Sequence, residues 1–154
     1  MPFHIVLVEP EMAANAGNVA RTCACTGTTL HLIHPLGFST RDRRYKRAGL
    51  DYWDMAHILY HNSFDEFFAS RPAGRFLFTS TTAKRLYTDV EYQPGDHIVF
   101  GKESHGLPDF ILDNYPGIHI RIPMRSNARS LNLSNCVALV LYEALRQLNF
   151  PGMI

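Results

Sequence analysis

Six short apolar runs alternate with segments of helical pattern along this chain, and this alternation limits the possible folds more than any other feature. Val, Ile, Leu and Phe are frequent in the runs at 3–9, 29–35, 56–61, 75–80, 97–101 and 118–124. Runs of this length and composition are typical of strands. Strand and helix patterns that alternate favour one architecture. We therefore expect an α/β fold with a mainly parallel sheet and helices on both faces.

Local signals mark where the helices between these strands start and stop. Side chains that accept from free backbone N–H groups favour a helix start, and glycine favours a helix end. The remaining connections, 39–54 and 81–96, are polar. The expected helix signals are Asn15 or Asn18 as a cap and Gly27 as an end, the capping-box pair Ser63 and Glu66, Pro108 in the first turn of a short helix, and a closing helix over 132–148.

The composition fits one globular domain over residues 1–154. Hydrophobic residues make up 46% of the chain and charged residues 19%, which suits a sizeable core. The sequence has no run of about 18 apolar residues, and its start lacks a basic segment, so we predict neither a membrane span nor a signal peptide and expect a cytoplasmic protein. The three cysteines form no Cys-x-x-Cys pair, which argues against disulfides and zinc. We expect small core cysteines and no metal.

A basic run at 41–47 stands out from the nearly balanced remainder. It holds five of the fifteen Lys and Arg residues and only one of the fourteen Asp and Glu residues. Cationic side chains gather in this way where a protein contacts nucleic-acid phosphates, and Tyr45 lies within the run. A solvated helix face explains the same pattern equally well. The candidate RNA-binding residues are Arg41, Arg43, Arg44, Lys46 and Arg47.

Three polar stretches lie where parallel α/β sheets bind their ligands, beyond the strand ends. NAGNVARTC (15–23) places Arg21 on a helix expected to be buried, where an arginine needs an anionic partner. VFGKESHGLP (99–108) lacks the Lys and Ser/Thr of a triphosphate loop, so Glu103 either faces another ligand or is an ordinary turn residue. RSNARSLNLSN (125–135) offers more donors and acceptors than one helix cap uses, which predicts a loop around a polar ligand.

We call these stretches the first motif (15–23), the second motif (99–108) and, with the third stretch extended to its flanking residues, the third motif (122–147). In this order they resemble the three motifs of the SPOUT superfamily of RNA methyltransferases. The resemblance covers nearly the whole chain. EPE, TLHLIHPLGF and KRAGLDYWD are similar, more narrowly, to the small tRNA 2′-O-methyltransferases that act on the wobble nucleotide, cytidine or modified uridine 34, of leucine tRNAs. The resemblance implies S-adenosylmethionine as donor, a homodimer, and a C-terminal deep trefoil knot, although chains are generally unknotted.

The resemblance also implies a set of site residues. In such dimers the partner subunit completes each site, so Arg21 would serve the neighbour's donor, and Tyr142 and the first helix fall at the dimer interface. The functional polar residues of the family fall on Arg21, Glu103, Ser130 and Asn132, with Asn15, Asn18 and Ser134 in support. The donor would contact Thr79, Gly101, Ile122, Met124, Ser130 and Leu131.

The implied reaction is an in-line attack of a ribose 2′-oxygen on a sulfonium methyl, for which positioning provides much of the rate. A guanidinium titrates above about 12, so we expect Arg21 to clamp the phosphate or hydroxyl of the target rather than to act as a base. Glu103 has two open roles, assisting proton removal or orienting the donor. Ser130 and Asn132 would fix the loop of the third motif.

Two departures from the subfamily pattern affect the RNA contacts. EMAANAGN lacks the prolines and the threonine that flank the first asparagine, and His105 stands where arginine is usual. His105 would make a nucleotide contact pH-dependent, or it is an exposed loop residue. The compact length favours the wobble-nucleotide enzyme, with the run 41–47 against the anticodon stem. The alternatives are methylation at another tRNA or rRNA position and a non-catalytic RNA-binding or ligand-binding domain that has kept the fold.

Overall fold

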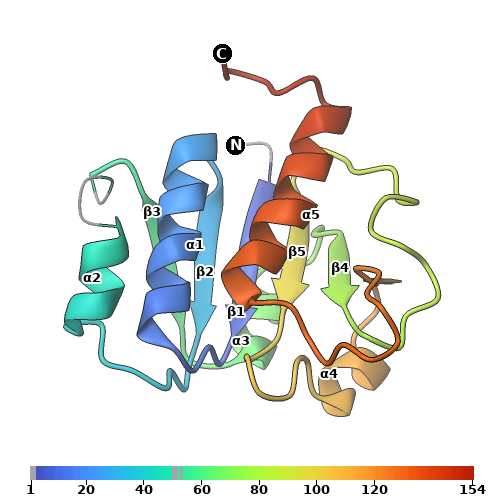
Figure 1. The fold of residues 1–154 in the computed structure, drawn as a ribbon, viewed down its shortest axis with the longest axis horizontal. Helices are drawn as coiled ribbons and strands as arrows, with labels where there is room; N and C mark the ends of the chain where they lie inside the picture. Colours follow the sequence, from blue (N-terminus) through green and yellow to red (C-terminus); the bar gives the residue numbers. More distant parts are fainter. Residues whose placement is uncertain (1–2, 50–51, 53) are drawn as a thin grey trace.

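The fold is built on a six-stranded sheet in which every strand pairing runs parallel (Figure 1). The computed structural model describes residues 3–49, 52 and 54–154. The prediction of a mainly parallel sheet is confirmed. The strand order across the sheet is β3-β2-β1-β5-β4-β6. The strands are β1 (Phe3–Val8), β2 (Thr29–Ile33), β3 (His57–His61), β4 (Phe76–Thr79), β5 (Asp96–Phe100) and β6 (Ile118–Ile120).

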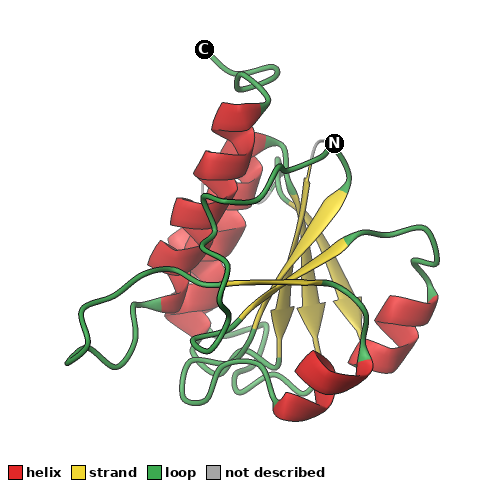
Figure 2. Ribbon diagram, turned by 90° about the vertical axis from the view of Figure 1, so that its right-hand side faces the viewer, coloured by secondary structure: helices red, strands yellow, loops and turns green. Residues whose placement is uncertain are grey.

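Helices cover both faces of the sheet, as predicted (Figure 2). Helices α1 and α5 lie against one face with α2 beside α1, and α3 and α4 lie on the other. Within the described residues, no helix is both long and apolar enough to cross a membrane. The helices are α1 (Ala13–Thr26), α2 (Arg43–Gly49), α3 (Phe64–Ala69), α4 (Asp109–Asn114) and α5 (Leu133–Gln147).

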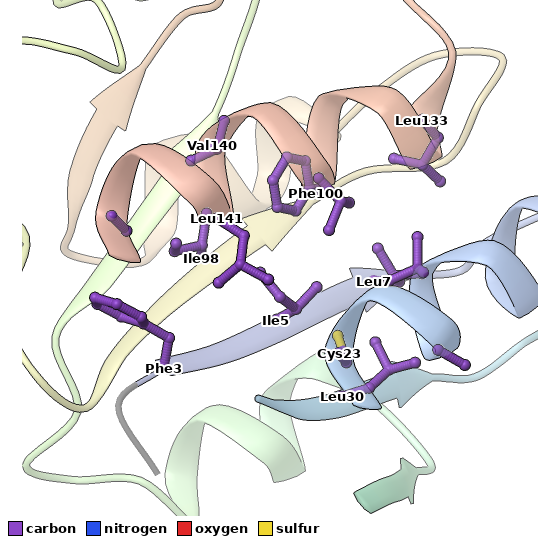
Figure 3. Close-up of a cluster of buried hydrophobic side chains, with 14 of the residues drawn as sticks. Phe3, Ile5, Leu7, Cys23, Leu30, Ile98, Phe100, Leu133, Val140 and Leu141 are labelled. Atoms are coloured by element: carbon purple, nitrogen blue, oxygen red, sulfur yellow. The ribbon is translucent and has the colours of Figure 1, made fainter. Parts of the chain in front are cut away.

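Strand β1 lies at the centre of the sheet and is buried on both faces. Successive side chains of a strand point to opposite faces. Ile5 and Leu7 therefore meet the inner sides of α1 and α5 (Figure 3), whereas Val6 and Val8 belong to the second core cluster, under α3 and α4. Burial on both faces explains why this strand reads as a continuous apolar run rather than as an alternating one.

The strand order reverses direction at the centre of the sheet. From β1 the chain builds outwards through β2 to β3, and it then returns to build β4, β5 and β6 on the other side. Strands β1 and β5 are consequently neighbours, with Leu7 paired to Phe100. In open α/β sheets ligands bind beyond the carboxyl ends of the strands at such a switch point. The segments that leave this point are 9–12 and 101–107.

The local helix signals were partly right. Gly27 ends α1 with a φ of 66°, and the hydroxyl of Ser63 accepts from the backbone N–H of Glu66 at 3.1 Å, so both predictions are confirmed. The prediction of Asn15 or Asn18 as the cap of α1 is wrong, because the helix begins earlier and Met12 is its N-cap residue. The segment 43–49 forms α2 rather than a plain connection.

The cysteine prediction holds only for Cys23, which is 1% exposed. Cys25 is exposed and Cys136 is intermediate. Cys25 lies on the outer side of α1, and two residues along a helix rotate a side chain through more than half a turn, so the two cysteines of this helix cannot both face the core. Leu50, Asp51 and Trp53, which belong to the KRAGLDYWD similarity, lie outside the described residues.

Candidate active site

A cavity of about 500 Å³ opens beyond the carboxyl ends of β4, β5 and β6. Its walls come from the loop 101–107, the segment 122–131 and the first turn of α5, which lie far apart in the sequence. A volume in this range is typical of sites for small organic ligands. The six residues predicted to contact the donor all line this one cavity: Thr79, Gly101, Ile122, Met124, Ser130 and Leu131. That they bind the donor stays a prediction.

The second motif forms a tight loop that only glycine permits at its start. A Cβ on Gly101 would lie 1.9 Å from the carbonyl carbon of Gly106, far inside any possible contact. The backbone N–H of Gly106 donates to the carbonyl of Lys102 at 2.8 Å, and Gly106 has a φ of 68°. The left-handed region at that φ favours glycine. The loop can therefore bring its backbone, and not only side chains, to the wall of the cavity.

Glu103 is tied to the start of α1. Its carboxylate accepts from the backbone N–H groups of Glu11 at 2.9 Å and Met12 at 2.6 Å, and from the amide of Asn15 at 3.3 Å. Met12 itself supplies no side-chain cap to the helix. Free N–H groups at a helix start attract an anion. Glu103 thus joins the second motif to the first, and its two open roles, assisting proton removal or orienting the donor, stay predictions.

Asn132 completes the junction from the third motif. Its side-chain oxygen caps α5 by accepting from the backbone N–H groups of Ser134 at 2.9 Å and Asn135 at 3.3 Å. Its amide donates to the side-chain oxygen of Asn15 at 3.1 Å. Asn15, which is 5% exposed, therefore contacts both Glu103 and Asn132. The three motifs meet at this one asparagine, while Ser130 stays exposed on the cavity wall.

Arg21 does not lie where its sequence context suggested. The side chain is exposed, and its guanidinium lies 5.1 Å from the ring centroid of Tyr52, so the expectation of a buried arginine is wrong. The expectation of an anionic partner stays a prediction. The small residues around it, such as Ala20 and Ala24, face the core, whereas Asn18, Arg21 and Cys25 share the outward side of α1. Arg21 is outside the cavity lining described above.

Most of the basic run lies in α2, and Tyr45 is its buried residue. Tyr45 is 2% exposed and its hydroxyl lies 2.8 Å from the hydroxyl of Tyr60, so this tyrosine is not available to stack on a base. Arg44 pairs with Asp42 at 2.9 Å. The exposed cations Arg41, Arg43, Arg44, Lys46 and Arg47 fit both interpretations of this run, a solvated helix face and a phosphate contact.

His105 lines the cavity and belongs to a short hydrogen-bonded chain that the sequence did not predict. Its Nδ1 lies 2.8 Å from the hydroxyl oxygen of Ser104. Ser104 in turn donates its hydroxyl and, at 2.9 Å, its backbone N–H to one carboxylate oxygen of Glu11. These hydrogen bonds from Ser104 are the main cause that lowers the pKa of Glu11, which keeps the carboxylate ionised.

The cavity wall carries more cations than the sequence analysis assigned to it. Lys102, Arg121 and Arg129 line it, and Arg121 is held by a hydrogen bond from its Nε to the carbonyl of Ala83 at 2.9 Å. These cations lie in different segments and show no pattern along the chain, so the fold was needed to find them. Together they suit a ligand with carboxylate or phosphate groups.

A second polar cluster lies away from this cavity, under α3. His4, His31 and His97 offer ring nitrogens within 4.8 Å of one another, a spacing that could hold a metal ion. The rings of His4 and His97, however, stack at 4.2 Å with an interplanar angle of 3°. The lone pairs of two parallel rings do not converge on one point, and the nearby cation Arg71 opposes another positive charge. We therefore describe this cluster as part of the packing.

Sequence and structure comparisons agree with this geometry. The model of the SpoU rRNA Methylase family matches residues 2–142, so the chain belongs to that family and the resemblance is confirmed. A Yersinia pestis protein named tRNA (cytidine(34)-2'-O)-methyltransferase is 48% identical over 159 residues, covering 99% of this chain and 98% of that protein. A solved structure described as giving insights into the 2-OH methylation of C/U34 on tRNA has a TM-score of 0.91 at 42% identity and covers 96% of each chain.

A more distant structure shares the fold alone. It is an AdoMet-bound rRNA methyltransferase from Sinorhizobium meliloti, with a TM-score of 0.85 and 22% identity. The match covers 95% of this chain and 56% of that one. The fold of the present chain is thus also found in proteins that bind this methyl donor.

Proposed function

We propose that this protein transfers a methyl group from S-adenosylmethionine to the ribose 2′-hydroxyl of nucleotide 34, cytidine or modified uridine, of leucine tRNAs. One observation carries the proposal: six donor-contact residues named from the sequence line one cavity beside the Glu103–Asn15–Asn132 junction. The proposal includes a cytoplasmic enzyme in which residues 1–154 form one catalytic domain with a C-terminal trefoil knot. The relatives named for C34 or C/U34 methylation support the choice of nucleotide.

The cavity fits the donor in size and chemistry. Phe100, Ile122, Leu131 and Leu133 offer apolar surface for a purine ring, and Thr79 and Gly101 sit at the strand ends beneath it. The cations of the wall suit the carboxylate of the amino acid part. When bound, the donor supplies an activated methyl on a sulfonium. The residues of this chain then have to orient that methyl and the ribose and to exclude competing water.

The basic residues at the cavity and on α2 support a contact with tRNA. Arg129 and Lys102 at the cavity and the cations of α2 would bind phosphates on either side of the target nucleotide. Phosphate contacts of this kind position an RNA without reading its sequence. They would therefore set the affinity, while the shape of the cavity selects the ribose to be methylated.

A homodimer is part of the proposal because α5 exposes two large hydrophobic side chains. Leu139 is 43% exposed and Tyr142 is 42% exposed. Helix α5 lies beside α1 (Figure 1), and Arg21 is on the exposed side of α1. A dimer formed through these helices would cover both apolar side chains. It would also account for the position of Arg21 outside the cavity of its own subunit, since this side chain would then clamp the RNA target in the partner's site.

The test is transfer of labelled methyl from S-adenosylmethionine to bulk tRNA that lacks this modification, followed by nucleoside mapping. We expect label on the ribose of nucleotide 34 of leucine tRNAs, and its loss in Asn132→Ala. Label at another position of tRNA or in rRNA would replace the proposed target. A protein that binds no donor and transfers no methyl would be a non-catalytic binding domain instead.

A further inference from the structure

Two segments at the β6 side of the cavity carry positive charge and no negative charge. Residues 80–88 and 117–135 contain five Lys and Arg residues and no Asp or Glu. The rest of the chain sets ten Lys and Arg residues against all fourteen Asp and Glu residues, so the two signs of charge are clearly separated. We call these five cations the basic ridge: Lys84, Arg85, Arg121, Arg125 and Arg129.

Hydrogen bonds hold the two segments of the basic ridge side by side. The backbone N–H of Arg121 donates to the carbonyl of Arg85 at 2.8 Å, and the N–H of Tyr87 donates to the carbonyl of Arg121 at 2.9 Å. The side chain of Arg121 adds the bond from its Nε to the carbonyl of Ala83 at 2.9 Å. The segment 80–88 is thus fixed beside the end of β6, and its cations are held in place next to those of the segment 117–135.

Most cations of the ridge are free to bind a ligand. Lys84, Arg85 and Arg125 are exposed, and the three ion pairs found between described residues involve other cations. Arg129 is also exposed, and it lines the cavity together with the half-buried Arg121. A row of cations of this kind at the rim of a cavity attracts a ligand that carries several negative charges.

We propose that the basic ridge binds the phosphates of the tRNA backbone that leads to the nucleotide in the cavity. The inference rests on the proposed function and names the surface along which its substrate lies. A nucleic-acid backbone carries one negative charge per nucleotide, and it gains affinity when cations displace its counterions. The donor has a single carboxylate, which one cation of the cavity wall can bind, so the donor does not account for the whole row.

The ridge lies nearer to the cavity than the basic run of α2 does. Helix α2 lies beside α1 towards the β3 edge of the sheet, whereas the ridge continues from β4 and β6 at the opposite edge (Figure 1). The two basic surfaces would therefore hold different parts of one RNA. We expect the ridge to bind the phosphates nearest to the target nucleotide.

The test measures the binding of a full-length, unmodified leucine tRNA transcript by fluorescence anisotropy at several salt concentrations. The variants are Lys84→Ala, Arg85→Ala, Arg125→Ala and the triple variant, because none of these side chains is in a hydrogen bond of the described structure. Each lost phosphate contact lowers the slope of log K against log salt by about 1. We expect single variants to bind about fivefold more weakly at about 0.15 M salt, and the triple variant about a hundredfold more weakly.

The matched control is Arg146→Ala, which removes the same charge from another part of the surface. Arg146 lies in the last turn of α5 and pairs with Glu143, whereas the first turn of that helix lines the cavity. We expect this variant to keep the affinity and the salt slope of the wild type. A salt slope that the alanine variants of the ridge leave unchanged would overturn the inference.

Methyl transfer separates binding by the ridge from catalysis. In the triple variant KM for tRNA should rise, while kcat at saturating tRNA and the donor affinity in calorimetry stay unchanged. The variant that combines Lys84→Arg, Arg85→Lys and Arg125→Lys keeps every charge and should bind tRNA as the wild type does, because both side chains bind phosphates. A triple alanine variant that loses donor affinity, at an unchanged salt slope for tRNA, would make the ridge part of the donor site and overturn the inference.

The outcomes also separate this inference from the proposed function. If the wild type methylates no tRNA while the ridge variants lower the salt slope, the proposed function fails and the ridge stands as an RNA-binding surface. If the wild type methylates nucleotide 34 and the ridge variants bind tRNA as Arg146→Ala does, the ridge is an ordinary solvated surface and the proposed function stands.

Discussion

Removing the carboxylate of Glu103 should destabilise the whole fold as well as the site. In Glu103→Ala the start of α1 loses an acceptor for two backbone N–H groups, and Asn15 loses one of its partners. Loss of a helix cap costs about 0.5–2 kcal/mol, and an anion at a helix start adds roughly 0.3–1 kcal/mol. Water reaches part of this side chain, which limits the total. We expect a loss of about 2 kcal/mol in the free energy of unfolding.

The assay is urea unfolding at fixed protein concentration, followed by circular dichroism, with a thermal scan beside it. For a chain of this size a loss of about 2 kcal/mol lowers Tm by roughly 4–8 °C. Glu103→Gln keeps an acceptor oxygen but not the charge, so its loss should be about half as large. Glu91→Ala, an exposed glutamate whose side chain is in no described hydrogen bond, is the matched control and should change stability by less than about 0.5 kcal/mol. A Glu103→Ala protein as stable as this control would refute the capping role.

Three further predictions follow from the geometry. Burial is the largest cause that lowers the pKa of His97 to about 4, below the value of roughly 6.5 in an unfolded chain. The folded state therefore binds fewer protons, and stability is lost as the pH falls from about 6.5 towards 4, by roughly 2–3 kcal/mol. We expect His97→Gln to flatten the dependence of the unfolding free energy on pH in that window. Gly101→Ala should abolish donor binding in calorimetry, because its Cβ has no space beside Gly106, whereas Gly152→Ala in the C-terminal turn should bind normally. Arg21→Lys should lower kcat at unchanged donor affinity, because an ammonium cannot form the bidentate contact of a guanidinium. Normal turnover in this variant would exclude the proposed contact of Arg21 with the RNA target.

Much of the fold could be predicted because its signals are local. Five of the six apolar runs match their strands to within one or two residues, whereas the run 118–124 starts with β6 but extends four residues past its end. Gly27 and Ser63 mark helix ends through contacts with their immediate neighbours. The same reasoning failed for the start of α1. Its cap comes from Glu103, about ninety residues away, and no pattern around Met12 and Asn15 reveals that partner.

The site was predictable in its residues but not in their partners. The donor-contact residues carried over from the resemblance line one cavity, yet Asn15 was given only a supporting role and proves to join Glu103 and Asn132. Arg21 was expected to be buried because small apolar residues surround it in the sequence. Its neighbours along the helix face inwards while it faces outwards, and only the packing of α1 against the sheet decides which side is which.

The most direct test of the central claim is a crystal structure of the protein with S-adenosylmethionine. We expect the donor in the cavity between the loop 101–106 and the segment 122–131, with a partner subunit packed on α5. A donor bound elsewhere on the molecule, or a cavity that stays closed to it at saturating concentration, would contradict the assignment of this cavity as the methyl-donor site.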